Sequence, residues 1–204
     1  MREKYLEVIN REPQKRITRY AAGIMGGTGF AVFFGCNVWD AIVALIVSVM
    51  IVAVGDWLAK RESNLLVYNG ILAFISEVII IGALKMGIAE HPDRIMIGIV
   101  MLLISGLSTT NGIRDLLQRD FISGFINIMN SFLGAAGIAF GIGLAIILFH
   151  EGYSDHFILN HSVPIQLLSC TVACTGFALW FKIRGKQVWY NSIGAVSYTH
   201  LRAH

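Results

Sequence analysis

The chain has 204 residues, of which 55% are hydrophobic and only 14% are charged. Its mean hydropathy is +0.66. Charged residues make up about 25% of a typical soluble domain, so this composition excludes a compact soluble protein. The formal net charge is +3, but the basic residues are interleaved with apolar stretches and form no single basic face. We therefore expect no nucleic-acid partner.

Residues 1–19 are predicted to form a short cytoplasmic amphipathic lead-in, in which Pro13 ends any helix. Six long apolar stretches follow it. They comprise residues 20–39, 41–59, 64–84, 95–113, 121–149 and 163–181. A helix needs about 20 apolar residues to cross the roughly 30 Å hydrocarbon layer, where its backbone amides find partners only within the helix. The sequence therefore predicts an all-α integral membrane protein, a polytopic bundle of about six transmembrane helices.

The basic residues lie mainly on one side of these stretches. With the N-terminus in the cytoplasm, thirteen Lys and Arg residues fall in the cytoplasmic connections, and two, Lys85 and Arg94, fall in the external ones. Cytoplasmic loops of membrane proteins carry the excess of Lys and Arg. We therefore expect a multi-pass protein of the cell inner membrane with a cytoplasmic N-terminus.

Two sequence patterns concern how the helices are arranged. Glycine pairs four residues apart, such as Gly137 and Gly141, let helices approach closely in lipid. In addition, the run Gly-Phe-Ala-Val-Phe-Phe at 29–34 is echoed by Gly-Phe-Ala-Leu-Trp-Phe at 176–181. An odd number of spans separates the two runs, so the second copy would start from the opposite side of the membrane. Inverted repeats of this kind are common in transporters.

Glu77 lies well inside the third apolar stretch. A charged residue at mid-membrane costs about 2.5–3.5 kcal/mol on insertion scales, so Glu77 should face the bundle interior or a water-filled cavity. Two interpretations are open. The carboxyl takes up a proton on one side of the membrane and releases it on the other, or it stays neutral and is hydrogen-bonded to a neighbouring helix.

Two further acids lie near the ends of the first hairpin. Asp40, at the external end, is a candidate for proton coupling and for contact with a substrate ammonium group; the alternative is a helix cap, because Asp is a favoured cap residue. Asp56 lies near the cytoplasmic end, four residues before Lys60. Acid–base pairs at this spacing are common on helices, so we expect an Asp56–Lys60 ion pair.

A polar segment at 105–115 interrupts the fourth apolar stretch, and Gly106 and Gly112 would let it unwind. Irregular backbone persists at membrane depth only when it is buried in protein or lines a wet cavity. Unwound helix ends offer partners for both charged groups of a free amino acid. The predicted substrate-binding residues are Ser105, Gly106, Thr109, Thr110, Asn111 and Arg114. Alternatively, Thr110 and Asn111 cap a surface helix and Arg114 binds a lipid phosphate.

No pattern in the chain indicates a cofactor or an enzyme. The three cysteines lie in apolar stretches, where free cysteine usually behaves as a small buried hydrophobe. The histidines between 150 and 161 lack the spacing of known metal sites. No phosphate-binding glycine loop or nucleophile elbow is present. We therefore expect no metal, no cofactor and no ATP-driven transport by this chain alone.

Two runs resemble a known family. They are Gly-Phe-Ala-Val-Phe-Phe-Gly at 29–35 followed by Trp39-Asp40-Ala41, and Thr-Asn-Gly-Ile-Arg-Asp-Leu-Leu at 110–117 followed by Asp120 and Ser123-Gly124. Both resemble the threonine/serine exporter family, and the resemblance covers about residues 6–149. It implies a ten-span assembly, with a second five-span half in the same chain or in a partner, coupled to the proton gradient as an antiporter.

The resemblance also implies a domain organisation: a five-span domain at 20–149, an external loop at 150–163, and the first span and start of the second span of the C-terminal half at 164–196. The sequence departs from the family in three ways. Ser105-Gly106 replaces the usual Pro-Gly, which softens the helix break. The cytosolic N-terminal region is nearly absent. The second half stops early, and we expect residues 197–204 to be a non-native tail, because they are polar where an apolar helix is required.

These features together predict a proton-coupled secondary exporter of small amino acids, mainly threonine and serine. Its partners would be the small-molecule substrate, protons and the lipid bilayer. Two alternatives are open: a dicarboxylate exporter of the same family, for which Arg114 is equally suited, and a membrane interaction subunit without a substrate path.

Overall fold

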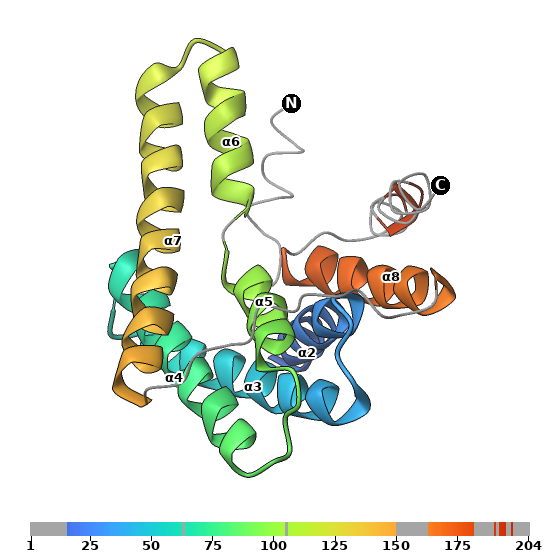
Figure 1. Ribbon diagram of the computed structural model, residues 1–204. Helices are drawn as coiled ribbons and strands as arrows, with labels where there is room; N and C mark the ends of the chain where they lie inside the picture. Colours follow the sequence, from blue (N-terminus) through green and yellow to red (C-terminus); the bar gives the residue numbers. More distant parts are fainter. Residues whose placement is uncertain are drawn as a thin grey trace.

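In the computed structural model, residues 16–62, 64–104, 106–149, 163–181, 190, 192–194 and 197 are described. The elements of this part of the chain are α-helices: α2 (Arg16–Phe33), α3 (Val38–Leu58), α4 (Leu65–Lys85), α5 (Pro92–Leu103), α6 (Gly106–Leu117), α7 (Phe121–Phe149) and α8 (Val163–Trp180). Figure 1 shows α2, α3, α4, α5 and α8 gathered in one bundle, while α6 and the first half of α7 form a hairpin that extends from it. The expected all-helical membrane class is confirmed.

Local sequence signals explain where the helices begin and end. Gly35, in the turn after α2, has φ 95°, and Gly87, in the turn after α4, has φ 71°; glycine adopts this left-handed region without steric cost. The Asn64 side chain caps α4 by accepting a hydrogen bond from the Leu66 N–H at 3.0 Å. Pro92 occupies the first turn of α5, where its missing N–H has no intrahelical partner to lose.

Fewer helices are long enough to cross a membrane than the sequence suggested. Among the described residues, α3, α4 and α7 qualify, and a fourth span results if α5 and α6, which are bent by 48° at their junction, are taken together. The expected count of about six is therefore too high for this part of the chain. The first turn of α2 contains Arg16 and Arg19, so its uncharged part covers about 21 Å at 1.5 Å per residue. The apolar part of α8 is similarly short.

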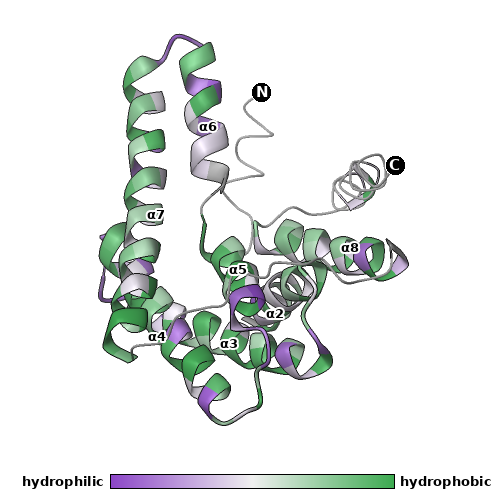
Figure 2. Ribbon diagram, in the orientation of Figure 1, coloured by the Kyte–Doolittle hydropathy of each residue, from purple (hydrophilic) through white to green (hydrophobic). Residues whose placement is uncertain are grey.

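The core of the bundle lies around α3, which packs against α2, α4 and α5. Val47 and Ile51 on α3, Leu72 on α4 and Ile95 and Ile99 on α5 are all buried in this core. By contrast, the outer surface of α7 remains strongly apolar, as Figure 2 shows by its green colour. Large exposed apolar surface on a single chain is typical of contact with lipid or with another protein.

Glycine brings α4 and α7 into backbone contact. A methyl group on Gly137 would collide with the Leu66 carbonyl oxygen, and one on Gly141 would collide with that of Gly70. The predicted packing face at Gly137 and Gly141 is therefore confirmed. In lipid, where apolar burial drives little association, such close van der Waals contact is a main source of helix pairing.

The two echoed runs lie against one another on α2 and α8, which pack antiparallel. A methyl group on Gly29 would lie 2.8 Å from the Ala173 backbone nitrogen, and one on Gly176 would lie 2.5 Å from that of Gly26. The rings of Phe30 and Phe177 meet edge to face with centroids 5.0 Å apart.

These contacts are reciprocal. In the echoed runs, each residue corresponds to the one 147 positions later, so Gly26 corresponds to Ala173, Gly29 to Gly176 and Phe30 to Phe177. The contact of Gly29 with Ala173 therefore has its counterpart in the contact of Gly176 with Gly26, and Phe30 meets its own counterpart. Such reciprocity is the mark of a two-fold interface. Around this contact, α2 and α8 are related by an approximate two-fold axis.

Replacing Gly29 by alanine should destabilise the protein, because the methyl group meets backbone atoms of α8 that cannot rotate away. Overpacking of this kind costs about 1–3 kcal/mol. Gly143→Ala is the matched control, since a methyl group there has no atom within 4 Å. We expect the melting temperature of the detergent-solubilised protein to fall for Gly29→Ala and to stay level or rise for Gly143→Ala. Equal melting temperatures would contradict this account of the contact.

Candidate functional site

The predicted functional residues lie at two different ends of the bundle. We call the end at which α2 ends and α3 begins the Asp40 end, and the end at which α2 begins and α3 ends the Arg19 end. The polar segment of α6 follows the last residue of α5 at the Arg19 end, while α5 begins beside Asp40. The 12 residues of α5 correspond to about 18 Å of helix. The structure therefore does not bring the α6 residues and Asp40 together.

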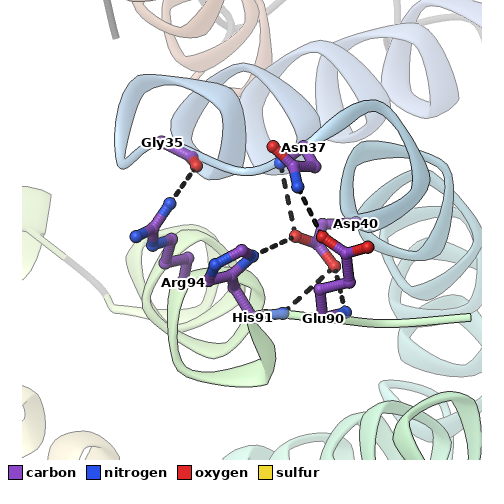
Figure 3. Close-up of polar contacts among 6 residues, drawn as sticks. All are labelled: Gly35, Asn37, Asp40, Glu90, His91 and Arg94. Carbon is purple, nitrogen blue, oxygen red and sulfur yellow. Dashed lines mark hydrogen bonds and ion pairs between the residues drawn. The ribbon is translucent and has the colours of Figure 1, made fainter. Parts of the chain in front are cut away.

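Asp40 is fully buried and accepts hydrogen bonds from the α2–α3 turn and from the α4–α5 connection (Figure 3). Its Oδ1 accepts from the backbone N–H groups of Glu90 at 2.9 Å and His91 at 3.3 Å. Its Oδ2 accepts from the Asn37 N–H at 3.2 Å and lies 3.1 Å from Nδ1 of His91. Asp40 thus caps the first turn of α3 and also ties the α2–α3 turn to the α4–α5 connection.

Two neighbouring contacts strengthen this link at the Asp40 end. The Asn37 amide donates to the Glu90 carboxylate at 2.6 Å, and the buried Arg94 guanidinium donates to the Gly35 carbonyl oxygen (Figure 3). Both join the same two connections that Asp40 joins. The capping alternative for Asp40 therefore has direct geometric support, while its role in proton coupling stays a prediction.

Glu77 lies inside the bundle and is only 1% exposed. It belongs to the buried side of α4, together with Asn69, Leu72, Ser76 and Ile80. The interior position expected for an intramembrane acid is therefore observed. A role in proton transfer is not decided by burial alone and stays a prediction.

The helix break expected near Ser105 is present, but the backbone beyond it is regular. α5 ends at Leu103, Ile104 is extended with φ −66° and ψ 125°, and α6 runs without interruption from Gly106 to Leu117. Unwinding at Gly112 is therefore wrong: the missing side chain at Gly112 instead lets α6 approach Gly124 and Ile128 of α7.

Most of the predicted substrate-binding side chains on α6 are accessible. Thr109, Thr110, Asn111 and Arg114 are exposed, and α6 packs along α7. Ser105 and the surroundings of Gly106 fall outside the described residues. The role of all six residues in binding substrate stays a prediction.

A polar site that the sequence did not predict lies at the Arg19 end. Arg19 Nη1 and Asp56 Oδ1 are 2.5 Å apart, so the expected pairing of Asp56 with Lys60 is wrong. Arg19, Asp56, Trp57 and Lys60 line a cavity of about 490 Å³ between α2 and α3. The Arg19 guanidinium also lies 5.7 Å from the centroid of the Trp180 ring on α8.

Arg19 also lines a second, deeper cavity of about 190 Å³. Its walls come from α2, α3, α4, α5 and α8, and its polar lining includes Tyr68 and the buried amide of Asn69. Leu102 and Leu103, the last residues of α5, line it as well, so the cavity reaches the helix break. One sequence signal could have indicated this site: Arg19 and Asp56 are charges of opposite sign at the same end of two adjacent apolar stretches.

Replacing Asp40 by asparagine should loosen the link between the α2–α3 turn and the α4–α5 connection. An amide offers one oxygen, and its NH2 group would face N–H donors, so buried groups would be left unsatisfied at a cost of about 1–3 kcal/mol. We expect a lower melting temperature and faster amide hydrogen exchange at residues 86–94. Asp93→Asn, at the same end of the bundle, is the control and should change neither by a comparable amount. Unchanged exchange in Asp40→Asn would show that the link does not hold this connection.

Comparison with known proteins identifies a family. Residues 2–149, well over half of the chain, match a family described as "Putative threonine/serine exporter". The comparison with curated proteins and that with solved structures found no match. The matched region contains α2 to α7, and with them Asp40, Glu77 and the Arg19–Asp56 pair. The chain therefore belongs to the threonine/serine exporter family.

Proposed function

We propose that the protein is a proton-coupled secondary transporter that exports small amino acids, threonine and serine above all, across the inner membrane. Membership of the exporter family supports the transport of amino acids. The observation that carries proton coupling is the burial of Glu77 inside an apolar helical bundle. A carboxyl group in that position is expensive to keep charged, and intramembrane acids commonly serve proton relays.

The two ends of the bundle support a direction of transport. The positive-inside rule places the Arg19 end in the cytoplasm, because the N-terminus and most Lys and Arg residues lie on that side. Two cavities open this end, whereas Asp40 and its partners hold the opposite end together. This arrangement is that of a carrier open toward the cytoplasm, ready to accept a substrate for export.

The helix break between α5 and α6 adds a second element to the proposal. It adjoins the deeper cavity through Leu102 and Leu103. The carbonyl oxygens at the C-terminal end of α5 carry partial negative charge, so they attract a cation such as an ammonium group. Ser105 and Gly106 would then contact the substrate at the break, and Thr109, Thr110, Asn111 and Arg114 would contact it along α6 on its way to or from the cavity.

An interaction subunit without a substrate path is the second candidate function. It is favoured by the α6–α7 hairpin, whose aromatic side chains are strongly exposed, with Phe121, Phe125 and Phe132 at 65%, 61% and 68%. A second five-span half in the same chain or in a partner would also use this surface. Efflux measurements separate the two functions, because a subunit of this kind exports nothing by itself.

Glu77→Gln should abolish the proton dependence of export, because glutamine keeps the size and hydrogen bonding of the side chain but cannot release a proton. Cells loaded with a threonine dipeptide and energised by a proton gradient should export threonine about tenfold or more slowly than cells with the wild type. Glu62→Gln, outside the helices, is the matched control and should export normally. Wild-type, gradient-dependent efflux from Glu77→Gln would refute proton coupling through this residue. No efflux from the wild type would refute the exporter itself.

A further inference from the structure

The paired charges at the Arg19 end sit beside empty space. The Arg19 and Asp56 side chains are 41% and 28% exposed, and both line the 490 Å³ cavity. Arg19 extends into the lining of the 190 Å³ cavity as well. An ion pair that only fastened α2 to α3 would need neither cavity. The Asp56 Oδ1 atom that faces Arg19 is itself buried, but both side chains are partly accessible, so a ligand can reach the pair from the cavity without disrupting the core.

We propose that this pair is a binding site for free α-amino acids, in which Arg19 holds the carboxylate and Asp56 holds the ammonium group. The site rests on the proposed export function for its biological role. The ligand carboxylate replaces Asp56 as the partner of Arg19, and the ligand ammonium replaces Arg19 as the partner of Asp56.

Charge balance makes this exchange favourable for one class of ligand. A zwitterion brings one positive and one negative group, so neither Arg19 nor Asp56 is left uncompensated when the pair opens. Opening the pair without such a ligand would leave both charges without a partner. A dicarboxylate would leave Asp56 beside a second anion and without a cation. The site should therefore bind amino acids more tightly than dicarboxylates. This preference distinguishes an amino-acid exporter from a dicarboxylate exporter, two functions between which the sequence does not decide.

The deeper cavity supplies the remaining recognition groups and limits the size of the side chain. The Tyr68 hydroxyl lies close to α3, since a methyl group on Gly55 would be 2.8 Å from it, and both residues line the cavity. The Asn69 amide also lines it and donates a long hydrogen bond of 3.4 Å to the Gly134 carbonyl oxygen. A volume of about 190 Å³ is below the roughly 300–1,000 Å³ of drug-sized pockets. These groups suit a small hydroxylated side chain.

The Trp180 ring covers the Arg19 guanidinium at 5.7 Å. A cation over an indole ring is held electrostatically, so Arg19 keeps its position when Asp56 turns to the ligand. Trp180 also places a fluorescent group at the site. Binding should change its emission.

The test uses all 204 residues of the chain, purified in lipid nanodiscs, and measures binding by calorimetry and by tryptophan fluorescence. The probes are L-threonine, N-acetyl-L-threonine, L-threonine methyl ester and succinate. N-acetylation removes the ammonium group, and esterification removes the carboxylate. We expect threonine to bind, each modified threonine to bind about tenfold more weakly or worse, and succinate to bind most weakly.

The variants assign each charged group of the ligand to one residue. Asp56→Asn should weaken threonine binding and cancel the penalty of N-acetylation, while the penalty of esterification remains. Arg19→Gln should do the reverse. Such pairwise coupling between a ligand group and a side chain distinguishes contact from a general loss of stability. Arg61→Gln, whose guanidinium lies 4.6 Å from the centroid of the Trp57 ring at the same end, is the matched control and should bind all four probes normally.

Three results would overturn the site. They are succinate binding as tightly as threonine, both penalties surviving in both variants, and loss of threonine binding in Arg114→Gln but not in Arg19→Gln. If Asp56→Asn or Arg19→Gln does not fold, Asp56→Glu and Arg19→Lys keep each charge but change its position or shape. Asp56→Glu should then reduce the penalty of N-acetylation, and Arg19→Lys should reduce the penalty of esterification.

Efflux from proteoliposomes distinguishes failure of the site from failure of the proposed function. If Arg19→Gln and Asp56→Asn both export threonine as fast as the wild type, the binding site is refuted and the export function stands. If the expected binding pattern is found but the wild type exports no threonine, the export function is refuted and the binding site stands.

Discussion

The fold depends on close contact between helix backbones at glycine. In lipid there is little hydrophobic gain when two apolar helices associate, so dispersion contacts at short range must hold them together. Two helix pairs meet this requirement in the structure: α4 with α7 through Gly137 and Gly141, and α2 with α8 through Gly26, Gly29 and Gly176. α3 and α5 fill the space between them with ordinary aliphatic packing.

Polar contacts act at the ends of the bundle, where backbone groups at helix termini lack partners. At one end, three backbone N–H groups and a histidine ring converge on the Asp40 carboxylate. At the other end, Arg19 and Asp56 form an ion pair, and Arg19 lines two cavities. One end is therefore fastened and the other accessible. This asymmetry follows from packing and hydrogen bonding alone, and it does not depend on which side of the membrane each end faces.

Features that depend on local composition were predictable from the sequence, and features that depend on distant pairing were not. The helical class, the Gly137–Gly141 face and the break before Gly106 follow from apolar length and glycine spacing. The number of spans was overestimated, because an uncharged stretch need not form one helix: the stretch at 20–39 loses its last residues to the turn after Phe33, where α2 ends. Asp56 was paired with its neighbour Lys60, whereas its partner is 37 positions away on another helix. A carboxylate at a helix end has several basic neighbours in range, and only the packing of α2 on α3 selects one.

The separation of Glu77 from the Arg19–Asp56 pair limits how a proton could drive export. Asn69, in the lining of the deeper cavity, lies eight residues before Glu77 on α4, which corresponds to about 12 Å of helix. A zwitterion in that cavity has no net charge and is too far away to exchange its proton or its charge with Glu77. Coupling must then pass through the position of α4 itself. Because α4 is in backbone contact with α7 along Gly137 and Gly141, a shift of α4 must either move α7 with it or break that contact. A shift of this pair between two discrete positions is what coupling between distant sites requires.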